Sequence, residues 1–286
     1  MINNYFQQSA EEKKWIDIYA SIQTGKILKG LVSSAEQFTT PKGSKIECCS
    51  VIYNGIKVWI PSSEMGISKE KLETINEHTG KTLERTILRS MVGAEIDFIV
   101  EGIDSQKAFA IGSRTKAMKK RKALEFHKLK EGDNILARVV AVGRSIVVTE
   151  VYGTECIVPK EEVDYGYIND LNEYVQVGDN KPAKIKSIDY EKEEVSISFK
   201  DAKHDPYENI DDRYEEGGEY FSTISGIKEF GIFVELEQGI NALCPHPNWV
   251  NYIPDKGDNV LVKIKKIDKN KRKINASLIR LIRKNR

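Results

Sequence analysis

The chain has 286 residues, of which 40% are hydrophobic and 30% charged, and its formal net charge at pH 7 is +1. This length accommodates two or three small domains. No apolar run approaches the ~18 residues that a membrane helix needs, and the N-terminus lacks the basic and apolar segments of a secretory signal, so we expect a cytoplasmic protein. A net charge this close to zero argues against indiscriminate binding to polyanions.

The first 24 residues predict an amphipathic helix. Ser9 and Glu12 have the spacing of a capping box, which marks the start of a helix. Apolar side chains at helical spacing follow, namely Trp15, Ile18, Tyr19 and Ile22. The sequence leaves open whether this stripe packs on the first domain of the same chain or on a partner.

Three copies of one unit follow the helix. A Gly precedes a Pro by six residues three times, as Gly55/Pro61, Gly153/Pro159 and Gly239/Pro245. A second Gly precedes an Ile-Asp pair by ten and eleven residues, and a Ser lies nine residues past each Asp. These second glycines are Gly93, Gly178 and Gly257. A spacing kept three times indicates one supersecondary unit used repeatedly.

The repeats and their charge bands predict the domain boundaries. We expect an N-terminal helix over 1–24, a first barrel over 25–115, a basic linker helix over 116–130, a second barrel over 131–200, an acidic linker over 201–216 and a third barrel with a basic tail over 217–286. The first repeat is nine residues longer than the others before its first Gly, which predicts an insertion around residues 34–44.

The third repeat shows the pattern of the unit most clearly. Buried-type residues alternate with Leu and Lys over 260–265, which is the period of a half-buried strand. Five short strands, with an excursion between the third and the fourth, fit a small closed Greek-key barrel of the OB type. The predicted fold class is therefore mainly β, with three tandem five-stranded OB barrels, an N-terminal helix and a helical linker.

The third repeat also resembles a known family. GIKEFGIFVELEQGINALCP followed by KGDNVLVKIKKIDKNKRKINASL is similar to the S-one family of RNA-binding domains, with its F-G-x-F-V strand, its G-D-x-V-x-V-x-I-x-x-I-D run and its closing I-x-x-S-L. The basic and acidic linkers are similar to those of the family's bacterial ribosomal member. The whole arrangement resembles a shortened, three-repeat version of that member.

The third repeat is the predicted RNA-binding site. Alternation places Ile232 and Val234 inward, so Phe233 faces outward, with Phe230 beside it. Exposed aromatic rings stack unpaired bases whatever the base identity. The resemblance implies a basic residue near the final turn and a His after the third strand. With neighbouring cations, the remaining candidates are Lys228, His246, Lys263, Lys265, Arg272 and Lys273.

The first two repeats lack this aromatic pair. Phe230 and Phe233 lie nine and six residues before Gly239. The same places before Gly55 hold Ile46 and Cys49, and those before Gly153 hold Arg144 and Val147. We therefore expect these repeats to act as docking modules. The basic band over 114–130 could bind phosphates or could be a solvated helix face, and the sequence leaves both open.

Two functions fit these patterns. The first is a single-stranded RNA-binding protein whose third repeat holds messenger RNA while the first two dock on the small ribosomal subunit or similar machinery. The alternative is a protein–protein interaction adaptor, for example from a mobile element, that uses its barrels to engage host ribosome or RNA-processing machinery. Because no catalytic, cofactor or metal pattern is visible, we expect neither an enzyme nor a cofactor. Exposed rings at Phe230 and Phe233 are required only by the first function.

Overall fold

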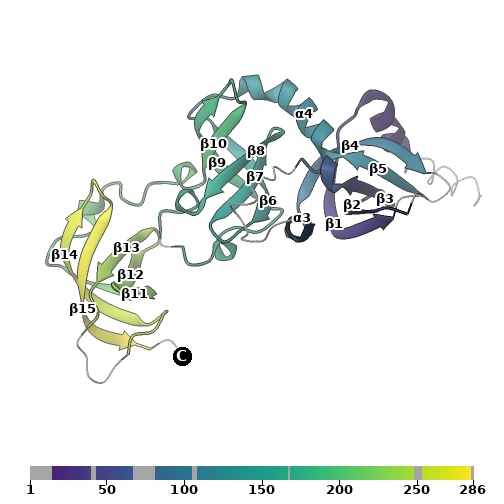
Figure 1. The fold of residues 1–286 in the computed structure, drawn as a ribbon. Helices are drawn as coiled ribbons and strands as arrows, with labels where there is room; N and C mark the ends of the chain where they lie inside the picture. Colours follow the sequence, from purple (N-terminus) through teal and green to yellow (C-terminus); the bar gives the residue numbers. More distant parts are fainter. Residues whose placement is uncertain are drawn as a thin grey trace, which may run out of the picture. The chain divides into compact units, whose positions relative to one another are not determined.

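The computed structural model describes residues 15–39, 43–66, 81–104, 108–166, 168–247 and 253–284. The chain divides into two compact units, one of residues 1–159 with 171–198 and one of residues 160–170 with 199–286. The first unit holds two barrels and the second unit holds the third barrel (Figure 1). Among the described residues, no helix combines the length and the apolar character needed to cross a membrane.

Each barrel consists of five strands, which confirms the predicted fold class. The first contains β1 (Leu28–Thr39), β2 (Lys45–Tyr53), β3 (Ile56–Pro61), β4 (Glu95–Asp104) and β5 (Phe109–Ser113). The second contains β6 (Asn134–Val142), β7 (Ile146–Val151), β8 (Thr154–Pro159), β9 (Asn180–Asp189) and β10 (Glu194–Ser198). The third contains β11 (Glu219–Lys228), β12 (Gly231–Glu237), β13 (Ile240–Cys244), β14 (Asn259–Asp268) and β15 (Lys273–Arg283).

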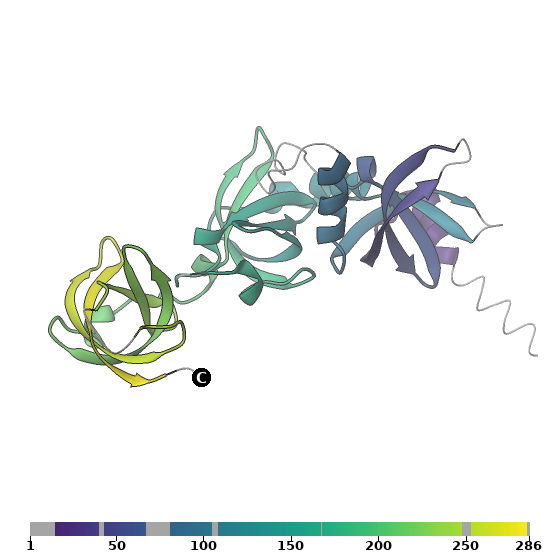
Figure 2. The ribbon, with the colours of Figure 1, turned by 60° about the horizontal axis from the view of Figure 1, so that its bottom comes forward.

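The strand order is the same in all three barrels. The first and third close in the order 1-2-3-5-4, through a parallel pair of the third and fifth strands. Figure 2 looks almost down the axis of the third barrel and shows its strands as a ring. The second sheet has the same order, but it stays open between β8 and β10 in the described residues.

Short helices connect these strands. Two of these helices are the α-helices α3 (Lys81–Ser90) and α4 (Arg114–Glu125). The 3-10 turns are η1 (Ser62–Glu64), η2 (Phe126–Lys128), η3 (Lys160–Glu162), η4 (Leu171–Glu173), η5 (Lys200–Ala202) and η6 (Ile210–Asp212). The predicted linker helix is α4, which begins where the Ser113 hydroxyl accepts a hydrogen bond of 3.0 Å from the Lys116 N–H.

The second set of repeated glycines has one structural role. Gly93, Gly178 and Gly257 all adopt φ angles between 90° and 93°, a left-handed conformation that favours glycine. Each glycine N–H donates to a carbonyl of the barrel's first strand, at 2.8 Å for Gly93, 3.0 Å for Gly178 and 2.8 Å for Gly257. The strict spacing in the sequence therefore marks the corner at which the fourth strand joins the first.

A buried ion network joins the first two barrels. Glu150 of β7 accepts hydrogen bonds from Arg114 of α4 at 2.8 Å and from Arg138 of β6 at 2.7 Å. Arg138 also donates to Asp97 of β4 at 3.1 Å, and Arg121 of α4 pairs with the other Asp97 oxygen. The side chains of Arg114, Glu150 and Asp97 are fully buried. We call these five residues the inter-barrel network.

The pKa of Asp97 follows from its partners in this network. Burial alone raises the pKa of Asp97, but the hydrogen bonds and charges of Arg138 and Arg121 outweigh it, so that the pKa lies below its ordinary value. Asp97 is therefore charged near neutral pH, as the two arginines require. The basic band of α4 thus serves, at Arg114 and Arg121, to hold two barrels together.

The N-terminal helix packs on its own barrel through part of its apolar stripe. Residues 15–24 are helical, and Ile18 is fully buried in the core of the first barrel. Ser21 is also buried, and its hydroxyl accepts a 2.9 Å hydrogen bond from the Val100 N–H. Trp15 packs against the same core, whereas Tyr19 and Ile22 are exposed, so the stripe that the sequence predicts is divided between the barrel and the solvent. The capping box at Ser9 and Glu12 lies outside the described residues.

The insertion in the first repeat lengthens one hairpin. β1 and β2 remain paired from Val32 and Val51 out to Thr39 and Lys45. The corresponding hairpin of the third barrel ends at Lys228 and Gly231. The added residues therefore extend the first barrel outward and leave its closed strand order unchanged.

Candidate nucleic-acid interface

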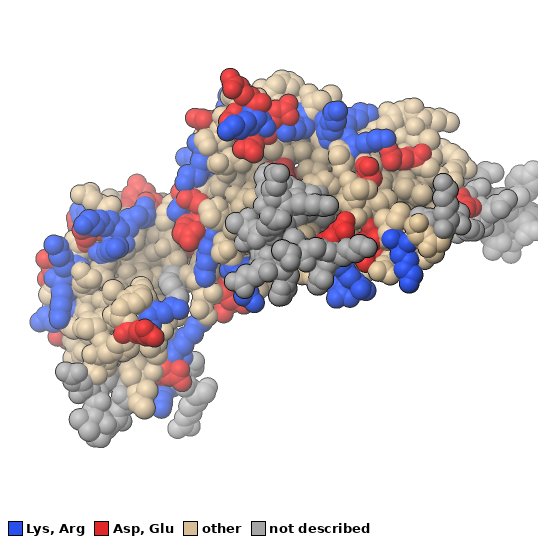
Figure 3. Space-filling model, viewed as in Figure 1, with Lys and Arg blue, Asp and Glu red and all other residues tan. Residues whose placement is uncertain are grey.

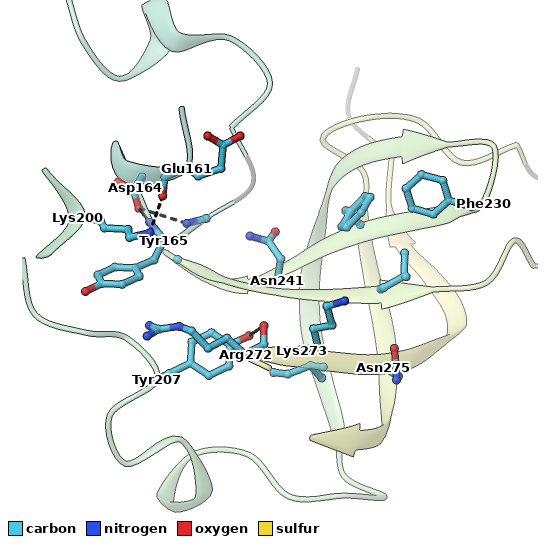
Figure 4. A pocket seen from close by; sticks show the side chains of 15 residues that line it. Glu161, Asp164, Tyr165, Lys200, Tyr207, Phe230, Asn241, Arg272, Lys273 and Asn275 are labelled. Atoms are coloured by element: carbon cyan, nitrogen blue, oxygen red, sulfur yellow. Dashed lines mark hydrogen bonds between the residues drawn. The ribbon is translucent and has the colours of Figure 1, made fainter. Parts of the chain in front are cut away.

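A groove of about 470 Å³ lies on the outside of the third barrel. Its floor is formed by side chains of β12, β13 and β15, including Phe233, Leu243 and Asn275. In Figure 4, Phe230 lies at one end, Tyr165, Tyr207 and Arg272 lie at the other, and Asn241 lies between them. All of these residues belong to the unit of residues 160–170 and 199–286.

The two phenylalanines have the orientation expected from strand alternation. Ile232 and Val234 are fully buried in the barrel core, and Phe233 between them lies on the outer face. Phe230, in the turn before β12, is 70% exposed. The two rings meet edge to face, with centroids 5.9 Å apart. A large ring this exposed gains little from burial, but it offers a free face on which a nucleobase can stack.

Arg272 is held by other side chains of the chain. Its guanidinium forks onto both carboxylate oxygens of Asp205, with a distance of 2.9 Å from Nη1 to Oδ2. The guanidinium carbon also lies 4.6 Å from the ring centroid of Tyr165 and 4.9 Å from that of Tyr207. The Tyr207 hydroxyl donates a 3.0 Å hydrogen bond to the Arg272 carbonyl. We call this arrangement the arginine clasp.

The clasp changes the ionisation of its members. Burial raises the pKa of Asp205. Hydrogen bonds from Arg272 and from the Tyr207 N–H, together with the Arg272 charge, lower this pKa by more than burial raises it, so it lies below its ordinary value. Burial, followed by nearby carboxylates, raises the pKa of Tyr165. Arg272, a predicted RNA contact, lines the groove, but its charge is already compensated by Asp205.

One wall of the groove comes from outside the third repeat. Asp164 is buried, its carboxylate accepts a 2.7 Å hydrogen bond from the Tyr165 N–H, and it pairs with Lys203. A Cβ added at Gly239, in the turn between β12 and β13, would lie 2.8 Å from Cγ of Pro206. Tyr165 and Tyr207 are the site residues that sequence reasoning missed, because they precede the repeat that they contact.

The other predicted site residues lie outside the groove. Lys228 and His246 are exposed and adjacent, with His246 Nε2 2.7 Å from the Lys228 carbonyl oxygen. Lys263 and Lys265 are exposed on β14 and do not line the groove. Figure 3 shows Lys and Arg side chains along the β14 side of this barrel and along α4. The structure thus brings together Phe230, Phe233, Arg272 and Lys273.

The sequence alignment of the three repeats needs a one-residue correction. Phe233 pairs with Leu243, which lies four residues after Gly239. The residues four after Gly55 and Gly153 are Trp59 and Ile157, and these pair with Ser50 and Val148. The predicted equivalents Cys49 and Val147 are therefore wrong by one position. The cause is a bulge between Glu235 and Glu237, which adds one residue to β12.

The corrected position in the second barrel is unavailable to a ligand. Val148 is only 7% exposed and packs in the hydrophobic cluster of the first barrel. The second barrel therefore has an aliphatic, covered residue where the third barrel has an aromatic one.

Comparison with known proteins identifies the class of these barrels. Residues 128–200 and 213–279 match the family model described as "S1 RNA binding domain". The second and third barrels therefore belong to the S1 RNA-binding domain family, which is the S-one family that the sequence resembles. The first barrel lies outside the matched residues.

Longer stretches of the chain are similar to ribosomal proteins. Small ribosomal subunit protein bS1 of Neisseria meningitidis is 26% identical over 277 residues, covering 92% of this chain and 45% of that protein. The bS1 of Chlamydia trachomatis is 24% identical over 280 residues, covering 95% and 46%. A Clostridium tetani 4-hydroxy-3-methylbut-2-enyl diphosphate reductase is 26% identical over 238 residues, covering 80% and 36%. The chain spans less than half the length of these relatives.

Proposed function

We propose that this protein binds single-stranded RNA in the groove of the third barrel, as a non-enzymatic, cytoplasmic factor related to ribosomal bS1. The observation that carries the proposal is the pair of outward rings, with Phe230 70% exposed on a groove of about 470 Å³. Lys273 on the same surface supplies a charge for the phosphate backbone. Most of the chain is similar to a small ribosomal subunit protein, bS1, and the messenger RNA of our proposal is the ligand that the family resemblance implies.

Fluorescence anisotropy with a labelled oligouridylate tests this proposal. Replacing Phe230 and Phe233 together by Ala should weaken binding by roughly 2 to 6 kcal/mol, on the basis of two stacked bases. The matched control is Phe221→Ala, because Phe221 is 57% exposed on β11 of the same barrel and does not line the groove. Unchanged affinity in the double variant, or an equal loss in the control, would refute the proposal.

A docking role for the first unit is the second candidate. The N-terminal helix presents Ile16, Tyr19 and Ile22 to solvent, at 58%, 44% and 37% exposure, which is unusual for apolar side chains spaced on one helix. Co-sedimentation with small ribosomal subunits should be lost in a Tyr19→Ser/Ile22→Ser variant and kept in the double-Phe variant. Co-sedimentation that survives the helix variant, or that depends on added RNA, would contradict this role.

A further inference from the structure

The first barrel carries three aromatic rings on its outer surface. Trp59 lies between the buried residues Val58 and Ile60 of β3, so its ring points away from the core. The Phe38 ring lies 5.6 Å from that of Trp59 and 5.8 Å from that of Phe109, measured between centroids. All three side chains are half-buried. We call these three residues the first-barrel aromatic face.

Strand pairing places this face where the third barrel has its groove. Trp59 occupies the position of Leu243, since both lie four residues past the shared Gly and pair with equivalent residues. Phe109 pairs with Lys57 across the parallel strands. Phe109 therefore has the position that Lys273 has in the third barrel. Phe38 lies on the extended hairpin, beyond the point at which the third barrel turns at Phe230. The two surfaces therefore coincide in the fold but use rings from different strands.

The charges near the aromatic face are balanced. The Lys57 ammonium lies 4.0 Å from the Trp59 ring centroid and pairs with Glu36 at 2.9 Å. Hydrogen bonds from Ser34 and then Lys57 lower the pKa of Glu36, so this carboxylate is charged at neutral pH. A ligand held here gains from ring stacking and little from phosphate contacts.

We propose that the first barrel carries a second binding face for unpaired nucleobases, formed by Phe38, Trp59 and Phe109. This face goes beyond the function proposed for the third barrel, and it gives the first repeat a role besides the docking that the sequence predicts. It binds a single strand through base stacking with a weak dependence on salt, because the adjacent cation is compensated. The two sites lie in separate units of the chain, so either one can fail without the other.

Tryptophan fluorescence of the full-length chain tests this face. The chain has three tryptophans, so replacing Trp15 and Trp249 by Phe leaves Trp59 as the only reporter. Phe230→Ala and Phe233→Ala are added to remove the proposed third-barrel site. Titration with a twelve-nucleotide oligouridylate should quench Trp59 emission, and an abasic strand of the same length should not. Quenching that is equal with the abasic strand, or absent with both, would overturn the proposal.

Variants of the neighbouring rings give a second readout. Phe38→Ala and Phe109→Ala should each weaken the Trp59 titration by about 5- to 150-fold, which corresponds to the loss of one stacked base. Tyr152→Ala is the matched control, because Tyr152 is an exposed aromatic residue of the second barrel. If the face variants leave the oligonucleotide titration unchanged but reduce co-sedimentation with ribosomal subunits, the face contacts protein and the proposal is wrong.

Discussion

Two basic regions of this molecule look alike in sequence and differ in structure. In the first unit, Arg114 and Arg121 of α4 enter the inter-barrel network, where Arg114 is fully buried. In the third barrel, Lys263 and Lys265 are exposed on β14, and Lys273 is exposed and lines the groove. A run of Lys and Arg therefore does not by itself indicate a phosphate-binding surface. The cations of such a run have a structural role where acidic side chains of the same chain pair with them, and they are available to a ligand where no acidic side chain does.

The largest expected effect is on the inter-barrel network. Glu150→Ala should destabilise the first unit by about 3 to 5 kcal/mol, because it leaves the buried Arg114 without its carboxylate partner and removes one of the carboxylates that Arg138 contacts. Chemical denaturation followed by tryptophan fluorescence measures this change. Glu125→Ala is the control, since Glu125 pairs with Lys128 at 3.1 Å on the surface and should cost at most about 0.5 kcal/mol. Equal losses of stability in the two variants would mean that the inter-barrel network contributes no more than a surface ion pair.

The glycine before the third strand of each barrel tests how tightly α4 packs on the second barrel. Gly55 and Gly153 have φ angles of 80° and 81°, so Ala at either position costs about 1 to 2 kcal/mol in backbone strain. At Gly153 a Cβ would also lie 2.3 Å from the Met118 carbonyl oxygen of α4, whereas at Gly55 it would meet open space. Gly153→Ala should therefore destabilise by roughly 2 kcal/mol more than Gly55→Ala in the same denaturation experiment. Similar costs would show that α4 does not pack tightly on this turn.

The smallest expected effect concerns the arginine clasp. Asp205→Asn frees the Arg272 charge for a phosphate, so RNA binding should tighten by about 0.2 to 1 kcal/mol, and log affinity should fall more steeply with log salt, by about one unit of slope. Asp211→Asn serves as the control, since Asp211 of η6 pairs with Lys269 and does not line the groove. Weaker binding in Asp205→Asn would show instead that the clasp is needed to shape the groove.

Local patterns were sufficient to predict the barrels and the rings. Strand alternation has a period of two residues, so the outward direction of Phe233 could be read from its buried neighbours Ile232 and Val234. The repeated glycines predicted three copies of one unit because Gly93, Gly178 and Gly257 each need a left-handed backbone. The fold and the aromatic end of the groove could therefore be predicted from the sequence.

Contacts between distant segments could not be predicted in this way. The acidic linker gave no sign that Asp205 would pair with Arg272, or that Tyr165 from the second repeat would lie on the same guanidinium. The bulge in β12 displaced the alignment of the repeats by one residue. The aromatic face around Trp59 was missed for another reason, because its three rings come from three different strands that meet only in the fold. Charge and spacing describe one segment at a time, whereas these features depend on which segments fold together.

The most direct test of the third-barrel groove is photo-crosslinking. The full-length chain is irradiated with a single-stranded oligouridylate, and the adducts are located by mass spectrometry. Adducts on Phe230 or Phe233 are predicted, because bases stacked on these rings lie within bonding distance on excitation. Adducts confined to the lysines and arginines of α4, with none on residues 230–233, would contradict the account.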